Sequence, residues 1–252
     1  MLSVKELSIQ FGGLKAVDGV SFDVNPGEIF TIIGPNGAGK TTVFNLLSRI
    51  YEPTAGEMSF NGTSLLDIPA HGIAGIGIAR TFQNIELFDH ATVLQNLLVG
   101  RTCHGKTSFV EDLFFLPHVK QAERKHRRAV EETIDFLELA PYRDQMVANL
   151  PYGVRKIVEI GRALATQPDL LLLDEPASGL SSEETSDLAF WVSDIRKILG
   201  ITVLMVEHDM SLVRRVSDRV LAMSEGRSLA MGTVEEVTSD EKVISAYLGA
   251  AS

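Results

Sequence analysis

The sequence predicts an α/β fold, a mixed sheet flanked by helices, and three features of the chain indicate it. A glycine-rich loop at residues 34–41 joins an apolar, strand-like run to a helical run. After residue 155, apolar runs and helical segments alternate, which is the rhythm of a parallel sheet with crossover helices. Between these regions the chain looks helical, and a length of 252 residues suits one large α/β domain that carries a helical insertion.

The composition indicates a protein of a reducing compartment. The formal net charge of −10 argues against a nucleic-acid-binding surface, which needs a basic face to neutralise phosphates. The one cysteine, Cys103, can form no internal disulfide, and we interpret it as an ordinary buried or partly buried thiol. The first residues lack a signal-peptide pattern, and no apolar run approaches the ~20 residues that a membrane span requires. We therefore expect a cytosolic chain without a nucleic-acid partner.

The first third of the chain is expected to form short strands around the glycine-rich loop. Turn-forming Asn-Pro-Gly, Pro-Thr-Ala-Gly and Asn-Gly sequences at residues 25–27, 53–56 and 61–62 separate the apolar runs. The run at residues 28–33 is predicted to be a buried strand that leads into the loop, and residues 42–47 continue as a helix.

The middle of the chain is expected to be helical. Thr92 is predicted to cap a helix that starts at the next residue, and Pro117 precedes a longer helix predicted over residues 119–139. The apolar residues of this longer helix keep the i, i+4, i+7 spacing of one face: Val130, Ile134 and Leu137.

The longer helix also carries a cluster of basic residues: Lys120, Arg124, Lys125, Arg127 and Arg128. A solvated helix face explains this cluster, as does a surface for anionic lipid headgroups or for acidic loops of a partner. The sequence leaves both interpretations open.

The last part of the chain is predicted to alternate helices and strands. A helix is expected over residues 157–165 and an apolar strand over 170–174. A hairpin is expected from residues 219–224 and 227–231, turning at Glu225-Gly226.

The glycine-rich loop fits the pattern Gly-x-x-x-x-Gly-Lys-Ser/Thr in its strand-to-helix context. Such a loop presents backbone N–H groups to a polyphosphate, and glycines are needed because a Cβ would block the approach. Lys40 can reach the β- and γ-phosphates, and Thr41 can ligate Mg²⁺. The alternative, a turn with a chance lysine, leaves strand, helix and threonine unexplained together. The predicted nucleotide-binding residues are Gly34, Pro35, Asn36, Gly37, Ala38, Gly39, Lys40, Thr41 and Thr42.

Two carboxylates indicate which kind of nucleotide-binding protein this is. The apolar run at residues 170–173 ends in Asp174 and Glu175, where the chain turns and both side chains can face the phosphates. Asp174 suits the Mg²⁺ shell, directly or through water, and Glu175 can polarise an attacking water as a general base. Many strands end in aspartate, so the pair is informative only together with the phosphate loop.

With these motifs in this order, the chain resembles the ATP-binding-cassette (ABC) ATPases over essentially its whole length. The resemblance implies a P-loop NTPase core with an N-terminal antiparallel β subdomain and an inserted α-helical subdomain. It implies a single domain over residues 1–252. Within it, residues 1–84 hold the β subdomain and phosphate loop, residues 85–162 the helical subdomain, and residues 163–252 the rest of the catalytic core.

The resemblance also implies roles for three single residues. Phe11 is similar to the aromatic residue that stacks on adenine, and His208 to the catalytic histidine that contacts the γ-phosphate. Gln83 is similar to the glutamine that touches Mg²⁺ and senses the membrane partner. Taken alone, each has an ordinary interpretation, as a core aromatic, a strand-end histidine or a loop glutamine. Their order and spacing favour the functional roles.

The signature of that family, Leu-Ser-Gly-Gly-Gln, is replaced here by Leu-Pro-Tyr-Gly-Val at residues 150–154. Leu150 and Gly153 match the pattern and are expected to contribute to the nucleotide site. Pro151 stands where the family has a serine that donates its hydroxyl to the γ-phosphate. This departure leaves the competence of the segment open.

Four stretches resemble the ATPase subunits of branched-chain amino acid importers: residues 11–17, 80–84, the insertion around 101–120, and 246–249. ATPases of urea or amide importers and of lipopolysaccharide exporters share much of this pattern, so they stay as alternatives. A cassette protein that acts on nucleic acid or ribosomes is a further alternative. It fits less well, because the chain has no long coiled-coil insertion and no second cassette.

The resemblance implies cofactors, partners and a location. ATP and Mg²⁺ are the expected cofactors. The expected partners are transmembrane permease subunits, a second ABC ATPase in a heterodimer or homodimer, and indirectly an extracytoplasmic substrate-binding protein. The chain would then lie peripherally on the cytoplasmic face of the inner membrane.

Overall fold

The computed structural model describes residues 1–104 and 117–249. Most of the insertion expected around residues 101–120 therefore lies outside the described residues. The chain divides into two compact units. The core unit consists of Met1–Gln83 and Asp169–Ser252, and the helical unit of Asn84–Pro168.

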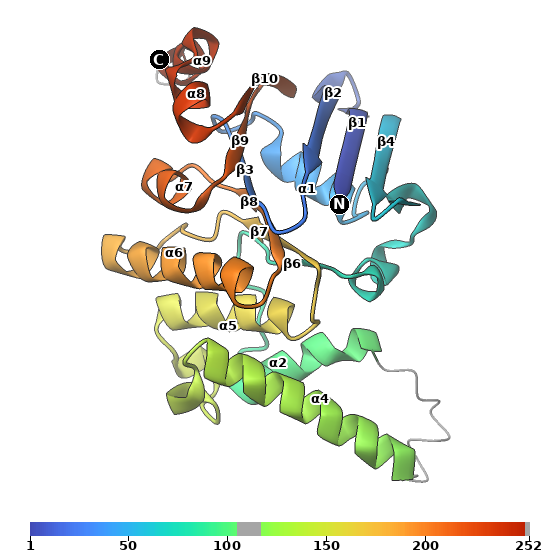
Figure 1. The fold of residues 1–252 in the computed structure, drawn as a ribbon, viewed down its shortest axis with the longest axis vertical. Helices are drawn as coiled ribbons and strands as arrows, with labels where there is room; N and C mark the ends of the chain where they lie inside the picture. Colours follow the sequence, from blue (N-terminus) through green and yellow to red (C-terminus); the bar gives the residue numbers. More distant parts are fainter. Residues whose placement is uncertain (105–116, 250–252) are drawn as a thin grey trace. The chain divides into compact units, whose positions relative to one another are not determined.

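The core unit contains two sheets (Figure 1). The antiparallel sheet has the strand order β2-β1-β4-β5 and is made of β1 (Leu2–Phe11), β2 (Leu14–Val24), β4 (Ala55–Phe60) and β5 (Thr63–Ser64). The second sheet has the order β10-β9-β3-β8-β7-β6. Its strands are β3 (Ile29–Ile33), β6 (Ile78–Arg80), β7 (Leu170–Asp174), β8 (Thr202–Val206), β9 (Arg219–Ser224) and β10 (Arg227–Gly232). Neighbouring strands of this sheet are parallel except the β9–β10 hairpin, so the predicted mixed sheet is confirmed.

Helices cover the six-stranded sheet within the core unit (Figure 1). The α-helices are α1 (Lys40–Leu47), α6 (Ser182–Lys197), α7 (Met210–Val216), α8 (Val234–Ser239) and α9 (Glu241–Gly249). Short 3₁₀ turns follow β5: η1 (Leu65–Asp67), η2 (Ala70–Gly72) and η3 (Ala74–Ile76). Helix α6 starts in a capping box, in which the Ser181 hydroxyl accepts from the Glu184 N–H and the Glu184 carboxylate accepts from the Ser181 N–H.

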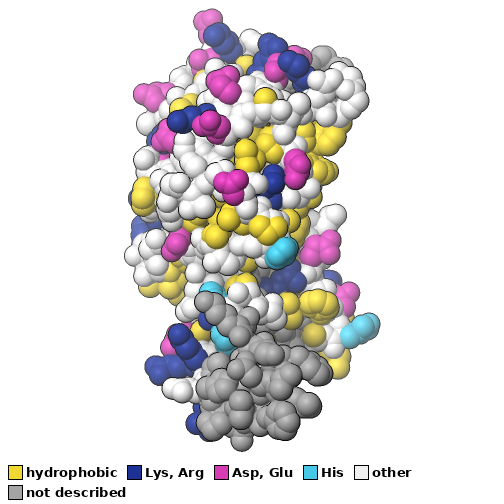
Figure 2. All heavy atoms as spheres, turned by 90° about the vertical axis from the view of Figure 1, so that its right-hand side faces the viewer, with side chains coloured by type: hydrophobic (Ala, Val, Ile, Leu, Met, Phe, Trp, Pro, Cys, Tyr) yellow, Lys and Arg dark blue, Asp and Glu magenta, His cyan; other side chains and the backbone are white. Residues whose placement is uncertain are grey.

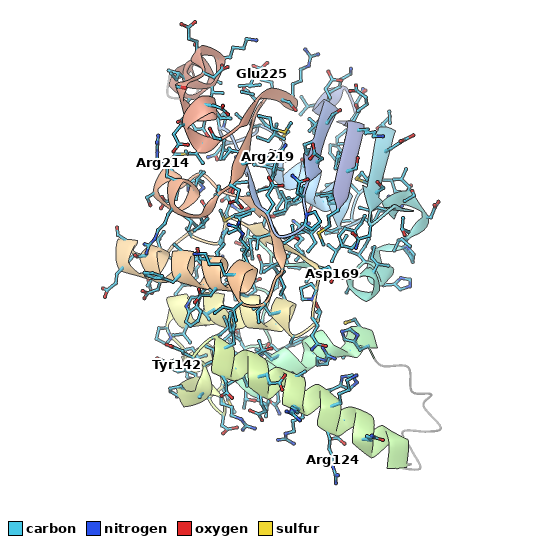
Figure 3. The ribbon with its side chains drawn as sticks, viewed as in Figure 1. Arg124, Tyr142, Asp169, Arg214, Arg219 and Glu225 are labelled. Atoms are coloured by element: carbon cyan, nitrogen blue, oxygen red, sulfur yellow. The ribbon has the colours of Figure 1, made fainter. Side chains whose placement is uncertain are left out.

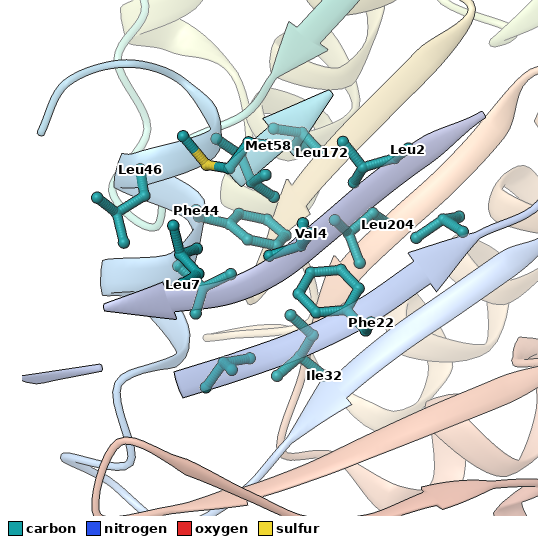
Figure 4. Packing of buried hydrophobic residues seen from close by; sticks show 14 of the residues in the cluster. Leu2, Val4, Leu7, Phe22, Ile32, Phe44, Leu46, Met58, Leu172 and Leu204 are labelled. Carbon is teal, nitrogen blue, oxygen red and sulfur yellow. The ribbon is translucent and has the colours of Figure 1, made fainter. Parts of the chain in front are cut away.

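The alternation of side chains along β3 divides the hydrophobic core into two layers. Phe30 and Ile32 are buried in one cluster with residues of the antiparallel sheet and α1 (Figure 4). Ile33 belongs to the other cluster, with apolar residues of α7, α8, α9 and β9. Because successive strand residues point to opposite faces, a strand covered on both sides is expected to be mostly apolar on both faces. This explains the apolar run that leads into the phosphate loop, in which Thr31 is buried with its hydroxyl 2.6 Å from that of Ser217.

The helical unit consists of α2 (Val93–Gly100), α4 (Pro117–Phe136), α5 (Tyr152–Leu164), η4 (Arg101–His104), η5 (Ala140–Tyr142) and η6 (Val147–Asn149). The predicted cap at Thr92 is confirmed as a capping box with Gln95. Helices α2 and α5 approach closely at Gly100, where an added Cβ would lie 2.3 Å from the Arg162 carbonyl oxygen. Of the basic cluster on α4, Arg124, Lys125, Arg127 and Arg128 are exposed, and the Lys120 side chain lies outside the described atoms.

Two helix boundaries differ from the sequence prediction. Helix α4 ends at Phe136, before the predicted residue 139, because Glu138 has a φ of 54° that no α-helix accommodates. Helix α5 begins at Tyr152, five residues before the predicted start at residue 157. Pro151 precedes it as the N-cap, with a φ of −54° and a ψ of 152°.

The C-terminal hairpin is confirmed, with Glu225 and Gly226 at its turn. Both residues have positive φ, 50° and 78°, which suits a two-residue hairpin turn.

The face shown in Figure 2 mixes acidic and basic side chains in its upper half, among hydrophobic ones. Among the described residues, no helix combines the length and hydropathy that crossing a bilayer requires.

Candidate functional site

The phosphate loop is shaped by two glycines that have no room for a side chain. Gly39 is the N-cap of α1 in the left-handed region, with a φ of 95°. A Cβ on Gly39 would lie 2.4 Å from the Ala16 carbonyl oxygen, and one on Gly34 would lie 2.2 Å from that of Met223. Gly37, with a φ of 82°, has open space where its Cβ would be. The loop is therefore enclosed at both ends and open in the middle, as a cradle for a polyphosphate requires.

The turn of the β9–β10 hairpin supports the loop. The Gly226 N–H donates to the Ala38 carbonyl oxygen at 3.1 Å, and the Asp18 N–H donates to the Gly226 carbonyl oxygen at 2.8 Å. These bonds connect the loop through the hairpin turn to β2. Segments about two hundred residues apart in sequence thus fix the backbone of one loop.

Lys40 is buried at the start of α1, with 5% of its surface exposed. Its ammonium donates to two carbonyl oxygens of its own loop, those of Gly34 at 2.8 Å and Pro35 at 3.1 Å. Burial lowers the pKa of Lys40 below its usual value, and nearby carboxylates, Glu175 first, partly offset this. The loop thus holds a cation at the site where phosphate oxygens are expected.

A cavity of about 660 Å³ opens over the loop. It brings together seven of the nine predicted loop residues with Gln83 and Glu175: its lining is Leu14, Lys15, Ala16, Asn36, Gly37, Ala38, Gly39, Lys40, Thr41, Thr42, Gln83, Glu175, Glu225 and Gly226. Gly34 and Pro35 are not part of this lining, but their carbonyl oxygens accept from the Lys40 ammonium. The volume of the cavity falls in the ~300–1,000 Å³ range of small-molecule sites.

Phe11, the predicted adenine-stacking residue, does not line this cavity. It is the last residue of β1, is 45% exposed, and its ring packs edge-on against Tyr51 with the centroids 5.2 Å apart. The chain then turns at Gly12, and the next strand brings Leu14 and Lys15 to the cavity instead.

Asp174 ends β7 and is 1% exposed. Its Oδ2 accepts from the Arg80 guanidinium at 2.8 Å, and its backbone N–H donates to the Thr81 hydroxyl at 3.3 Å. Asp174 does not line the cavity directly. It lies one residue before Glu175, which does.

Glu175 lies at the edge of the cavity in a strained conformation, with a φ of 47°. Its Oε2 accepts from the Gln83 side-chain amide at 3.0 Å, and the His208 Nδ1 lies 3.7 Å from the same oxygen. The His208 side chain is 53% exposed. The structure therefore brings two other residues chosen from the sequence, Gln83 and His208, close to one carboxylate oxygen of Glu175.

Two buried charged side chains beside the motifs, those of Arg80 and Glu207, were not predicted from the sequence to belong to the site. Glu207 has no exposed surface, and its carboxylate accepts from the backbone N–H groups of Ala177, His208 and Asp209 at 2.8–3.0 Å. It thus joins the loop after Glu175 to the turn that carries His208. The sequence signal that could have revealed Glu207 is its position as a charged residue directly after the apolar strand β8.

The signature segment belongs to the helical unit. Leu150 is 7% exposed, whereas Pro151 and Tyr152 are exposed and Gly153 is half-buried. The Pro151 carbonyl oxygen accepts from the Arg155 N–H at 3.0 Å, which closes the first turn of α5. The side chain of Leu150 is therefore part of this unit's interior, and its neighbours present the exposed surface.

Comparison with known proteins identifies the family. A family model described as "ABC transporter" matches residues 17–178, and one described as "Branched-chain amino acid ATP-binding cassette transporter" matches residues 227–252. The chain is 41% identical over 251 residues to the high-affinity branched-chain amino acid transport ATP-binding protein BraF of Pseudomonas aeruginosa, covering 100% of this chain and 98% of that protein. It is 40% identical, over the same shares, to LivG of Escherichia coli K12, which has the corresponding name.

A solved structure agrees with these matches. The ADP conformation of MJ1267, an ATP-binding cassette of an ABC transporter, superposes with a TM-score of 0.86 at 34% identity, covering 99% of this chain and 98% of that one. The predicted fold and family are thereby confirmed. The chain belongs to the ABC transporter family. Within it, the chain is an ATP-binding subunit and an ATPase.

Proposed function

We propose that the chain binds ATP with Mg²⁺ in the cavity over the phosphate loop and hydrolyses it to drive import of branched-chain amino acids. One observation carries the catalytic part of this proposal: a single cavity is lined by Lys40, Thr41, Gln83 and Glu175. The phosphate-binding cation, the candidate base and two candidate cation ligands thus face one space.

The chemistry of the donors fits Mg²⁺. The Thr41 hydroxyl, the Gln83 amide oxygen and the Asp174 carboxylate are all oxygen ligands, which this hard cation prefers. Among the described residues no cluster of three His, Cys, Asp or Glu side chains could hold a metal by itself. Mg²⁺ bound to a nucleotide needs no such cluster, because waters and phosphate oxygens complete its shell. When bound, the ion would neutralise negative charge that develops on the phosphates.

Within the site, each side chain has a distinct task. Lys40 would contact the β- and γ-phosphates, and the N–H groups around Gly37 would cradle them. Glu175 would orient the attacking water and accept its proton at Oε2, the atom that Gln83 and His208 approach. His208, half exposed beside it, would contact the γ-phosphate.

The exposed signature segment supports a second ATPase subunit as a partner. In the proposed assembly, each nucleotide lies between the phosphate loop of one subunit and the residues around Gly153 of the other. ATP would favour this closed dimer because it contacts both subunits only there. A permease would contact the Gln83 segment, and the chain would lie on the cytoplasmic face of the membrane. The partner ATPase is a different chain or a second copy.

The cargo is proposed from similarity. BraF and LivG are named for branched-chain amino acid transport, and residues 227–252 match a family model named for the same class. The cargo does not have to touch this subunit, so the residues that line the cavity give no information on which cargo is transported.

Two experiments test the proposal. The purified chain should hydrolyse ATP only with a divalent cation, and this activity should be lost in Glu175→Gln. Deletion of the gene, in a strain without a redundant system, should abolish uptake of labelled leucine. Undiminished leucine uptake with lost urea or amide uptake would instead support the related importers, and unchanged uptake of all three contradicts the proposed import role.

A further inference from the structure

Arg80 is a buried cation that no part of the proposed mechanism uses. It is the last residue of β6, lies three residues before Gln83, and has a side chain that is 8% exposed. Burying a guanidinium is costly unless it is paired and hydrogen-bonded. Its contacts therefore indicate what this position does.

The guanidinium contacts three separate segments. Its Nη2 donates to the Asp174 Oδ2 at 2.8 Å. Its Nη1 donates to two side chains of α1, the Asn45 Oδ1 at 2.8 Å and the Ser48 Oγ at 3.0 Å. The Arg80 Cζ lies 5.0 Å from the centroid of the Phe82 ring, in a cation–π contact.

Each of these segments carries one of the three oxygen donors proposed for Mg²⁺. Asp174 is contacted directly, Thr41 lies in the first turn of α1, and Gln83 follows Phe82 in the chain. A planar guanidinium with several N–H groups can hold such segments at fixed angles, which the point charge of a lysine cannot do.

We propose that Arg80 is a positioning residue for the divalent cation, which sets the relative placement of Thr41, Gln83 and Asp174. The inference rests on the proposed Mg²⁺-dependent function. Residues that orient metal ligands without touching the metal typically change metal affinity 10–100-fold when they are replaced. Because Phe82 and Gln83 are consecutive, a movement of the Gln83 segment would also reach Asp174 through Arg80.

The test measures cation binding directly. Mn²⁺ affinity is titrated by electron paramagnetic resonance on the full chain in the Glu175→Gln background, with ATP present and turnover blocked. Arg80→Met should weaken Mn²⁺ binding roughly 10–100-fold, and Arg80→Lys should fall between it and the parent. ATP affinity in EDTA should change less than about threefold in both variants, because Arg80 does not line the nucleotide cavity.

Arg219 offers a matched control within the same unit (Figure 3). Its Nη1 lies 3.2 Å from the Oε1 of the buried Glu28, and its Cζ lies 5.3 Å from the Phe30 ring centroid. Arg219→Lys thus disturbs a comparable ion pair and aromatic contact away from the metal donors. It should leave Mn²⁺ affinity unchanged.

A milder variant covers the case in which Arg80→Met does not fold. Asn45→Ala removes one acceptor of the guanidinium on α1 and should weaken Mn²⁺ binding several-fold. If the parent shows no ATP-dependent Mn²⁺ binding, the proposed metal requirement fails. If the parent binds Mn²⁺ and the Arg80 and Asn45 variants bind it equally well or more tightly, Arg80 is only a countercharge and the inference is wrong.

Discussion

The phosphate loop and the signature segment are the two regions expected to meet nucleotide, and their surroundings differ. In the loop, Lys40 is 5% exposed, and the Ala16 carbonyl oxygen leaves no space for a Cβ on Gly39. In the signature segment, Pro151 is exposed and Tyr152 is 45% exposed. The loop is fixed by its own unit, whereas the exposed surface of the signature segment is available to another molecule.

This difference explains why one motif keeps its pattern and the other departs from it. Glycine is required at residue 39 because the fold around it excludes other residues, whatever the nucleotide does. Nothing in the described helical unit imposes such a requirement on the side chain of residue 151. The fold of the helical unit therefore tolerates a departure at the signature segment. We expect such a departure to change the stability of the ATP-bound dimer and not that of the single chain.

Replacement of Lys40 should give the largest effect on the enclosed region. Lys40→Ala removes the cation expected to contact the β- and γ-phosphates, and residues 34–42 contain no other basic side chain. Hydrogen bonds to charged groups contribute roughly 1.5–3 kcal/mol each, so ATP affinity should fall about 100-fold or more. Isothermal titration calorimetry measures the change.

Lys15→Ala is the control for this prediction. Lys15 lines the same cavity, but it is exposed and paired with Asp18 at 3.0 Å. Its removal should change ATP affinity only slightly. Equal losses in both variants would mean that the cavity attracts ATP by general charge and that the enclosed position of Lys40 is unimportant.

Removal of the base should separate binding from turnover. Glu175→Gln preserves shape and loses the proton acceptor, so ATP should bind while hydrolysis falls at least 100-fold, within the ~10²–10⁴-fold contribution of general acid–base catalysis. An ATP-bound dimer, with itself or its natural partner, should then accumulate on gel filtration. Glu225→Gln, at an exposed carboxylate of the same cavity, is the control and should hydrolyse ATP normally. Near-normal hydrolysis by Glu175→Gln would falsify the general-base role.

Local sequence patterns pointed to candidate residues of this site, whereas contacts between distant segments left no pattern in the sequence. Lys40 was selected because it stands in the glycine-rich loop pattern, and Asp174 and Glu175 because they follow an apolar run; their roles stay predictions. Arg80 was missed, since its partners Asn45 and Asp174 are 35 and 94 residues away and no local spacing reveals them. Phe11 does not line the cavity and its ring packs against Tyr51, a contact that no local spacing reveals.

Elements of the fold that depend on local residues were likewise predicted, and one boundary that depends on packing was not. Strand β3 and the hairpin turn at Glu225-Gly226 were predicted because apolar runs and turn residues act locally. The start of α5 was missed because the helix begins immediately after Pro151, at a tyrosine and a glycine with low helix propensity. Packing of the later, amphipathic part of α5 overrides that local preference.

Glycine substitutions test whether the surroundings enclose the loop. Gly39→Ala introduces strain at a φ of 95° and a Cβ only 2.4 Å from a carbonyl oxygen, whereas Gly37→Ala introduces strain at a φ of 82° in open space. Gly39→Ala should therefore lose about 1–3 kcal/mol more free energy of unfolding than Gly37→Ala, the usual cost of overpacking. Urea unfolding of both variants measures this difference. Equal losses would show that the hairpin and β2 do not confine the loop.

The smallest effect is expected at the signature segment. Pro151 has neither a hydroxyl nor an N–H, so one donor that the family presents to the γ-phosphate is absent. Its φ of −54° and ψ of 152° are accessible to serine, which is also a favoured N-cap residue. Pro151→Ser should therefore keep α5 intact and add a donor.

We expect Pro151→Ser, in the Glu175→Gln background, to tighten the ATP-driven dimer by roughly tenfold or less. A hydrogen bond to a charged group is worth about 1.5–3 kcal/mol. The gain should be smaller than this, because the new hydroxyl can also accept from the N–H groups of the first turn of α5 as a helix cap. Pro151→Ala is the control, since it removes the ring without adding a hydroxyl. Analytical ultracentrifugation at saturating ATP measures both. If serine and alanine each weaken the dimer tenfold or more, the proline ring itself shapes the contact surface. The departure from the family pattern would then be a requirement of this assembly, and the contrast with the enclosed phosphate loop would have to be abandoned.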